Sequence, residues 1–425
     1  MTEITIKEYA SVNEKAYLEV LPNGLTVYVV PKRGFSKYCA YFAVNYGGSD
    51  RRFRTGKKWI NTPQGVAHFL EHKMFDTPEG DASTRLAING ASSNAFTSTD
   101  MTAYYFDCID MFRENLEILL NFVSVPYFTA ENVEKEQGII AQEILMSEDD
   151  PDYCLYYGLM KSLFRHNPAR DSVAGSVESI AKITPETLYS CHTAFYNPSN
   201  MVLCVAGDID PREVADAALR VLPEEKGIIP ERDYGPPESL APEATRFSAE
   251  MDVSLPLFMA GCKSEPATRD ADVMRLDLVS ALALDILAGH SSPLYFRLYK
   301  EGLVSSDFSA SFDASSGAAY SMFGGETRDP MRVYNEVLEE VSRICKTGPD
   351  ADLSRRIRKS ATGSYVRTFN SFDAICGSIT GSFFRGYDAL DMIDLIPAVT
   401  DDEITAFLRE RLDPANMAIS IINPK

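Results

Sequence analysis

Short apolar runs alternate with longer segments of helical character along the whole chain. The short runs are rich in β-branched and aromatic residues and predict strands. They cover 25–30, 38–46, 91–108 (two strands), 201–207, 253–261, 306–323 (a pair) and 417–422. The longer segments predict helices, and a candidate N-cap, Thr129, precedes one of them. They cover 65–75, 112–123, 131–148, 210–222, 272–288, 330–346 and 351–369. Each half therefore mixes strands and helices in an α+β pattern.

A change of composition separates the two halves. Proline is frequent between residues 222 and 245, and apolar periodicity is lost there, as is typical of a linker. The order of elements before this stretch is loosely repeated after it, and the strand at 417–422 echoes the one at 201–207. A duplicated chain is therefore expected. It would have an N-terminal metal-binding domain at 1–225, a linker at 226–245 and a structurally related domain without the metal motif at 246–425.

The composition is that of an ordinary globular protein, with 45% hydrophobic and 24% charged residues. The eight cysteines form no CxxC pair, which favours buried, reduced thiols and a reducing compartment. The N-terminus lacks the basic and apolar regions of a signal peptide, and no apolar stretch is long enough for a membrane span, so a cytoplasmic location is expected. A net charge of −20 argues against nucleic-acid binding. It permits attraction of cationic peptides, although it can also serve solubility alone.

One motif in the first predicted helix carries chemistry. In His68-Phe69-Leu70-Glu71-His72, the two histidines and the glutamate lie at helical positions i, i+4 and i+3, which share one face. Both imidazoles can therefore reach one ion with Glu71 on the same side, while Phe69 and Leu70 pack on the core. HxxEH is the inverted form of the HExxH zinc-protease motif. The plainer alternative is a surface or core helix that carries two histidines by chance.

A zinc site needs a further protein ligand, often a carboxylate. The helix predicted at 131–148 offers Glu136 and Glu143, which lie seven residues apart and so share a face. Ile139 and Ile140 between them can anchor the helix in the core. One carboxylate could bind the metal while the other orients a ligand. The remaining glutamates of this helix are expected to be solvated. The remaining histidines have no comparable partners and are expected to be structural: His166, His192 and His290.

These features resemble the insulinase, pitrilysin and mitochondrial-processing-peptidase family of inverted-motif zinc endopeptidases. The resemblance covers nearly the whole chain. It is carried by four segments: Leu21–Leu25, Gly65–Phe75, Ser92–Ser98 and Glu136–Glu143. It implies two homologous α+β halves that face each other like a clamshell around a chamber for peptides of modest size. Within the family, the chain looks like the zinc-bearing member of bacterial two-chain pairs.

The resemblance also implies roles for the residues of the motif. His68, His72 and Glu143 would bind one Zn²⁺ per chain, and Glu71 would be the general base toward the zinc-bound water. Glu136 would be the carboxylate that orients a ligand.

A second set of residues would bind the substrate. Asn94, Ala95 and Phe96 would lie on an edge strand beside the metal, to which the peptide adds as a further strand. For Asn94, the alternative is a turn residue at a strand end.

One part of the family pattern is missing. Active members or their partners usually carry an arginine and a tyrosine, seven residues apart, around a Gly-Leu pair. Alignment on Gly302–Leu303 puts Leu298 and Ser305 at these positions, and a shift by one recovers Arg297 but puts Val304 at the tyrosine position. Loss of an oxyanion donor costs about 10²–10³-fold in rate. A homodimer or a heterodimer with a paralogous chain is therefore expected, and the paralogous chain would supply the pair.

Alternatives to this interpretation remain. Tyr295, Arg297 or Tyr299 could act in a drifted register. The chain could also be a non-catalytic scaffold subunit, or a peptide-binding or maturation factor with little turnover. Scaffold relatives usually lose metal ligands, whereas this chain keeps them all, so an active zinc endopeptidase is the first hypothesis.

Overall fold

The computed structural model describes residues 4–267 and 270–425. They form two compact units, each built from segments that are not contiguous in sequence. Unit 1 contains the chain up to Ile144, Ser172–Asp233 and Val366–Asp391; unit 2 contains Leu145–Asp171, Tyr234–Tyr365 and Met392–Lys425. These units are defined by which segments pack together in space. The predicted domains, 1–225 and 246–425 with a linker at 226–245, are instead contiguous stretches of sequence, and we keep them as a proposal for how a duplicated chain is divided.

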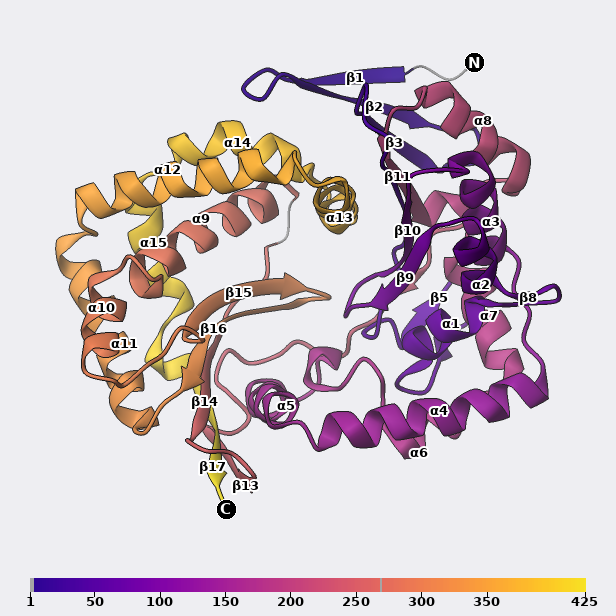
Figure 1. Ribbon diagram of the computed structural model, residues 1–425. Coiled ribbons are helices and arrows are strands. Elements are labelled where there is room, and N and C mark those ends of the chain that lie inside the picture. The colour runs from indigo at the N-terminus through magenta and orange to yellow at the C-terminus, as the bar shows by residue number, and fades with distance from the viewer. Residues whose placement is uncertain (1–3, 268–269) are drawn as a thin grey trace. The chain divides into compact units, whose positions relative to one another are not determined.

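Unit 1 is built on a seven-stranded sheet with the order β1-β2-β3-β11-β4-β10-β9 (Figure 1). The strands are β1 (Ile4–Tyr9), β2 (Glu14–Val20), β3 (Thr26–Pro31), β4 (Tyr38–Val44), β9 (Ser92–Thr97), β10 (Thr102–Cys108) and β11 (Met201–Gly207). β11 runs parallel to β3, and every other neighbouring pair is antiparallel. Every residue of β11 is buried, as its continuous apolar run predicts for a central strand.

Helices cover both faces of this sheet. Those on one side include α1 (Val66–Met74), α2 (Ala82–Ile88), α3 (Phe112–Ser124), α7 (Pro185–Phe195) and α8 (Pro211–Val221), whereas α13 (Phe372–Phe383) lies on the other (Figure 1). α4 (Ala130–Glu148) and the short α6 (Val177–Ile180) complete this set. α13 packs on β11 and β4, and Tyr41 on β4 donates a 2.6 Å hydrogen bond to Asp373 on α13.

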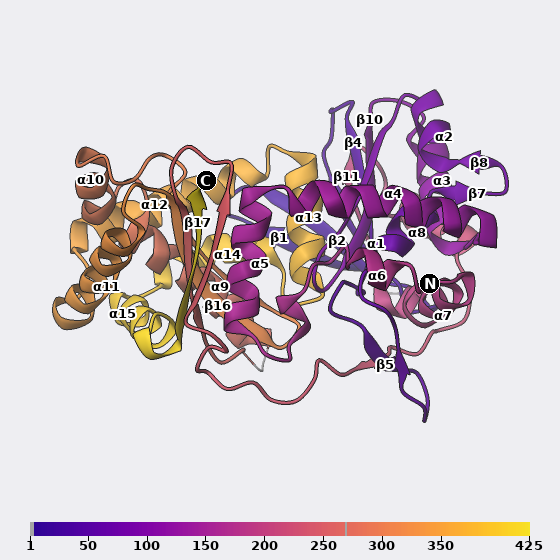
Figure 2. The same cartoon turned by 90° about the horizontal axis from the view of Figure 1, so that it is seen from below.

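Two small sheets also belong to unit 1. One has the order β12-β5-β6, from β12 (Glu231–Arg232), β5 (Arg52–Arg54) and β6 (Ile60–Asn61); the other joins β7 (Asp76–Thr77) and β8 (Gly80–Asp81). The β5–β6 hairpin extends away from the main sheet (Figure 2). The guanidinium carbons of Arg52 and Arg54 lie 5.0 and 4.7 Å from the centroid of the Trp59 ring. These cation–π contacts stabilise the hairpin.

Unit 2 repeats the central pattern. Its five-stranded sheet has the order β13-β17-β14-β16-β15. The strands are β13 (Arg246–Met251), β14 (Leu257–Lys263), β15 (Ser309–Ser315), β16 (Ala318–Glu326) and β17 (Met417–Pro424). β13 and β17 pair in parallel and the other neighbours are antiparallel. The series β3-β11-β4-β10-β9 of unit 1 has the same order and directions. The predicted α+β fold of two homologous halves is therefore confirmed.

The helices of unit 2 again lie on both sides of the sheet. One side holds α9 (Asp270–Ala288), α10 (Pro293–Lys300), α11 (Pro330–Thr347), α12 (Ala351–Thr368), α14 (Met392–Leu395) and α15 (Asp401–Arg411), and α5 (Pro151–Leu163) covers the other (Figure 1). α5 packs on β14 and β17, as α13 does on the corresponding strands of unit 1. The approach is close: a Cβ added to Gly158 would lie 2.4 Å from the ring of Phe247. Short 3-10 turns lie at Pro168–Arg170, Pro198–Asn200, Ala389–Asp391, Ile396–Ala398 and Pro414–Asn416.

The cysteines and the apolar helices bear on the predictions made from composition. All eight cysteines are free thiols, and six of them are buried. Among the described residues, no helix has the length and apolar character needed to cross a membrane.

Candidate metal centre

Helix α1 presents two histidines one turn apart. It starts after Gly65, whose φ of +91° favours glycine and whose added Cβ would lie 2.5 Å from a backbone oxygen. Phe69 and Leu70 are fully buried in the core, as predicted. The rings of His68 and His72 emerge on the opposite face with their centroids 4.6 Å apart. The apolar residues of the motif therefore anchor the helix, and its polar residues face the candidate site.

Helix α4 lies beside α1 (Figure 1). Thr129 caps it, accepting a 3.1 Å hydrogen bond from the backbone N–H of Asn132, as predicted. Ile140 is fully buried, but Ile139, also expected to anchor the helix, is 47% exposed. Adjacent residues point about 100° apart on a helix, and on α4 that rotation turns Ile139 toward solvent while Ile140 faces the core. With Ile140 turned inward, Glu136 and Glu143 both project toward α1.

Three groups converge between these helices. Glu143 Oε1 lies 3.5 Å from His68 Nε2, and Glu143 Oε2 lies 3.6 Å from His72 Nε2. One ligand atom from each of the three residues lies within 4.8 Å of the others. Tetrahedral zinc with bonds of about 2.0–2.1 Å requires ligand atoms roughly 3.3 Å apart. Two imidazole nitrogens and a carboxylate oxygen are also the donor types that zinc accepts. The three side chains therefore fit the ion.

Glu136 contacts the same centre from the outside. Its Oε1 accepts a 3.0 Å hydrogen bond from His72 Nδ1, and its Oε2 lies 3.3 Å from Lys73 Nζ. A proton held on Nδ1 leaves the lone pair of Nε2 free, and Nε2 is the nitrogen that faces Glu143. Glu136 thus holds His72 with the lone pair of Nε2 available for a metal ion.

Glu71 is the buried carboxylate of the site, with only 7% of its surface exposed. Thr97 on β9 donates a 2.8 Å hydrogen bond to Glu71 Oε2. Burial raises the pKa of Glu71, and the negative charge of Glu143 adds to this, while Thr97 and His72 act in the opposite direction. A carboxyl with a raised pKa is suited to exchange a proton near neutral pH.

The two histidines differ in their electrostatics. Burial and repulsion from His72 lower the pKa of His68 to about 4. Burial also acts to lower the pKa of His72, but its hydrogen bond to Glu136 and the charges of Glu71, Glu136 and Glu143 raise that pKa overall. His68 is thus neutral at pH 7, as metal ligation requires. Its buried Nδ1 has no hydrogen-bond partner within the described chain.

Sequence reasoning did not find two of the polar residues around the site, Lys73 and Thr97. Lys73 directly follows the motif and precedes Met74 and Phe75. A lysine in such an apolar helix end is a signal that could have been noticed. Thr97 ends the strand already quoted for the family resemblance, but nothing in its spacing indicates a contact with Glu71.

The predicted substrate-binding residues lie on β9, at the end of the seven-stranded sheet. In the described part of the chain β9 pairs only with β10. Asn94 is the third residue of the strand and is exposed, Ala95 is half-buried and Phe96 is 37% exposed. Helix α1 packs against this strand. An unpaired strand edge therefore runs beside the histidines.

The other three histidines do not join the site. His192 is buried in α7, donates a 3.2 Å hydrogen bond to the Val123 carbonyl and stacks on Tyr196. His290 packs against Tyr295 in unit 2, and His166 is exposed. Within residues 4–267 and 270–425, His68, His72 and Glu143 are the one group with metal-binding geometry.

The segment expected to carry the arginine and tyrosine forms α10 and the turn after it. Leu298 is fully buried in unit 2. Arg297 forms a 2.8 Å ion pair with Glu336. Gly302 adopts a φ of +64°, and its carbonyl accepts a 2.7 Å hydrogen bond from Arg328. In this unit, Leu298 thus serves packing, and Arg297 is already engaged by a carboxylate.

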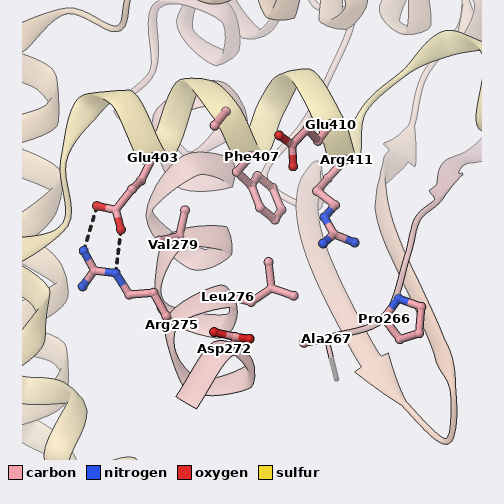
Figure 3. A pocket seen from close by; sticks show the side chains of 11 residues that line it. Pro266, Ala267, Asp272, Arg275, Leu276, Val279, Glu403, Phe407, Glu410 and Arg411 are labelled. Atoms are coloured by element: carbon pink, nitrogen blue, oxygen red, sulfur yellow. Dashed lines mark hydrogen bonds and ion pairs between the residues drawn. The ribbon is translucent and has the colours of Figure 1, made fainter. Parts of the chain in front are cut away.

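Unit 2 also has a pocket of about 390 Å³ between α9 and α15 (Figure 3). Arg275 and Glu403 join the two helices across it by two parallel hydrogen bonds of 2.7 Å. The bidentate Arg275 contact and the Thr400 cap hold the pKa of Glu403 at about 2, although burial opposes them. This arrangement links two helices, and it adds no group to the candidate metal centre.

Comparison with known proteins gives the same family on both halves of the chain. Residues 61–177 match the insulinase family, peptidase family M16, and residues 182–360 match the peptidase M16 inactive domain. The uncharacterized zinc protease YmfH of Bacillus subtilis is 35% identical, over 98% of this chain and 99% of its own. An uncharacterized zinc protease of Streptomyces coelicolor is 25% identical, over 85% of this chain and 81% of its own.

Solved structures agree with this result. An M16-like peptidase from Alicyclobacillus acidocaldarius superposes with a TM-score of 0.92 at 34% identity and covers 100% of this chain and 99% of its own. A protease from Helicobacter pylori, at 17% identity and a TM-score of 0.80 over the full length of both chains, shares the fold. The chain therefore belongs to the insulinase family of peptidases, family M16. YmfH, which matches almost the whole length of the chain, is named an uncharacterized zinc protease.

Proposed function

We propose that this protein is a zinc metalloendopeptidase that hydrolyses peptides, with the metal held by His68, His72 and Glu143. The observation that carries the proposal is their convergence: ligand atoms from two helices, α1 and α4, lie within 4.8 Å of one another. Chance placement of two histidines on a helix would not bring a glutamate of a distant helix between them. Nor would it place a second glutamate, Glu136, on the outer nitrogen of His72.

When bound, the zinc ion would supply a Lewis acid that acidifies water and polarises the peptide carbonyl. Glu71 accepts the proton of the attacking water and passes it to the leaving amine. Thr97 holds one oxygen of Glu71 and so fixes the direction of the carboxylate. Glu136 keeps His72 in the tautomer that can bind metal.

The edge of β9 supports a way of holding the peptide. A substrate in extended conformation adds to this edge through main-chain hydrogen bonds, along Asn94, Ala95 and Phe96. Such binding depends on the backbone more than on side chains. Specificity is therefore either broad or set by the shape of the chamber that the family resemblance implies.

We further propose that a paralogous partner chain completes the enzyme, because a second copy would carry the same Leu298 and Ser305. This rests on Leu298, which is buried where the family places its arginine. The same observation favours a second candidate function. Without the missing pair, the chain would bind peptides or assist their maturation with little turnover.

Metal analysis combined with cleavage of a quenched-peptide library tests the proposal. We expect about one zinc per chain in the wild type, lost in Glu143→Gln and retained in the matched control Glu134→Gln, which changes an exposed residue of the same helix. Chelator-sensitive cleavage by the purified chain would establish a self-sufficient peptidase. Zinc without cleavage would favour the half-enzyme, and the assay is then repeated with the paralogue. No zinc in a wild type supplied with the metal would overturn the proposal.

A further inference from the structure

Lys73, the residue that follows the HxxEH motif, is almost completely buried. Its side chain is 2% exposed, which places it among the largest fully buried side chains of the protein. Lysine is rarely buried unless its charge is compensated, because removal of an ammonium group from water is costly. Its neighbours Met74 and Leu70 are apolar and buried as well, so an apolar residue would suit this position for packing. Packing alone therefore does not explain why a lysine occupies position 73.

The contacts of Lys73 supply the reason. Its ammonium group forms a short ion pair with Asp76 at the start of β7, and it lies 3.3 Å from Glu136 Oε2 on α4. The other oxygen of Glu136 accepts the hydrogen bond from His72 Nδ1 at 3.0 Å. The two oxygens of one carboxylate are thus divided between a lysine and a histidine that adjoin each other in sequence.

Glu136 itself is largely buried, with 12% of its side chain exposed. A buried carboxylate with one neutral hydrogen-bond donor and no cation would be poorly compensated, and it would turn toward solvent or take up a proton. In either case its oxygen would no longer accept the His72 proton in a fixed direction. The ammonium group of Lys73 supplies the missing charge at the second oxygen.

We propose that Lys73 is a positioning residue of the metal centre: through Glu136 it holds the His72 imidazole in the tautomer and direction that bind zinc. This inference rests on the proposed function. Lys73 touches neither substrate nor metal. Asp76 anchors the lysine from the other side, and the order of contacts is Asp76, Lys73, Glu136, His72.

A double-mutant cycle on zinc affinity tests the inference with the full-length chain. The variants are Lys73→Met, Glu136→Gln and the two combined, and the dissociation constant for zinc is measured by competition with a chromophoric chelator at one pH. If Lys73 acts through Glu136, Lys73→Met weakens zinc binding about 10- to 100-fold in the wild-type background, the range seen for residues that orient metal ligands. In the Glu136→Gln background, the same substitution has an effect within about twofold.

Two controls separate positioning from folding. Asp76→Asn removes the anchor of Lys73 but keeps the ammonium group beside Glu136, so zinc affinity should fall by less than it does in Lys73→Met. Thermal unfolding of the metal-free variants reports any general loss of structure. The combined variant is the informative one, since replacement of both charges by neutral residues should recover stability without recovering zinc affinity.

The outcomes are distinct. Failure of the wild type to bind zinc would sink the proposed function itself. A wild type that binds zinc, with Lys73→Met binding equally well, would overturn only the role of Lys73. An equal loss of affinity from Lys73→Met with and without Glu136→Gln would also overturn it, because Lys73 would then act through the fold and not through Glu136.

Discussion

Thr97 Oγ1 lies 2.8 Å from Glu71 Oε2 and donates its proton to that carboxylate. The hydroxyl belongs to the strand edge on which the substrate is proposed to lie, and the carboxylate belongs to the helix that carries both histidines. The general base is therefore attached to the substrate-binding strand by a single hydrogen bond. Changes at this bond should alter the chemistry without altering the metal.

Replacement of Thr97 by valine tests this bond. The hydrogen bond lowers the pKa of Glu71 against the opposing effect of burial, so its removal should raise that pKa. Because Glu71 must be ionised to accept a proton, the acid limb of kcat/KM should move to higher pH, and the rate at neutral pH should fall about tenfold. Thr97→Ser keeps the hydroxyl and should retain the wild-type profile. An unchanged acid limb in the valine variant would contradict the role given to Thr97.

Replacement of Glu71 by glutamine separates metal binding from proton transfer. Glutamine has nearly the same shape, so zinc content should stay at the wild-type value, while kcat should fall about 10²–10⁴-fold. Zinc by elemental analysis and initial rates on a quenched peptide are measured on the same sample. Glu79→Gln, an exposed glutamate in the loop after β7, serves as the matched control. Substantial residual turnover in Glu71→Gln would assign the base to another group.

His192 predicts part of the acid sensitivity of unit 1. Burial lowers its pKa to about 4 from an ordinary 6.5, although the hydrogen bond to Val123 acts the other way. A histidine with a depressed folded pKa stabilises the fold above pH 6.5, and this contribution is lost as the pH falls from 6.5 toward 4. The free energy of unfolding should fall by about 3 kcal/mol over this range. Denaturant unfolding at a series of pH values should show a shallower slope for His192→Gln. The exposed control His166→Gln should keep the wild-type slope.

The family arginine cannot simply be restored at residue 298. Leu298 is fully buried, so Leu298→Arg would place a charge in the core of unit 2 and should destabilise it by about 3 kcal/mol or more. Phe296→Arg, at a residue of the same helix that is 67% exposed, should be tolerated. Both variants are compared by denaturant unfolding and peptide cleavage. A stable and more active Leu298→Arg would show that this segment can take the family role within one chain.

Long segments with a clear apolar pattern were predicted well from the sequence. β11 is a continuous apolar run, and the structure places it at the centre of its sheet with every residue buried. The helices that were missed include α5, α7, α10, α13 and α15. α13 contains Gly377, Gly381 and several serines, which favour loops over helices, and its packing on β11 and β4 is not visible in the local sequence.

For the candidate site, too, some residues could be predicted from sequence spacing and others could not. Helical spacing alone placed His68, Glu71 and His72 on one face, and a seven-residue interval placed Glu136 beside Glu143. The distance between the two helices depends on how the core packs, which no local pattern records. Contacts such as that of Thr97 with Glu71 are therefore found only in three dimensions.

The crossed placement of α5 and α13 has a consequence for how the protein can be cut. α5 precedes the proline-rich stretch at 222–245 yet covers the sheet of unit 2; α13 follows it yet covers the sheet of unit 1. An N-terminal fragment that ends in this stretch would contain α5 without the sheet of unit 2 on which it packs. The same fragment would contain the sheet of unit 1 without α13. Protease nicking there should leave the two pieces associated, and neither half expressed alone should be soluble. The duplicated halves have become obligate parts of one folding unit.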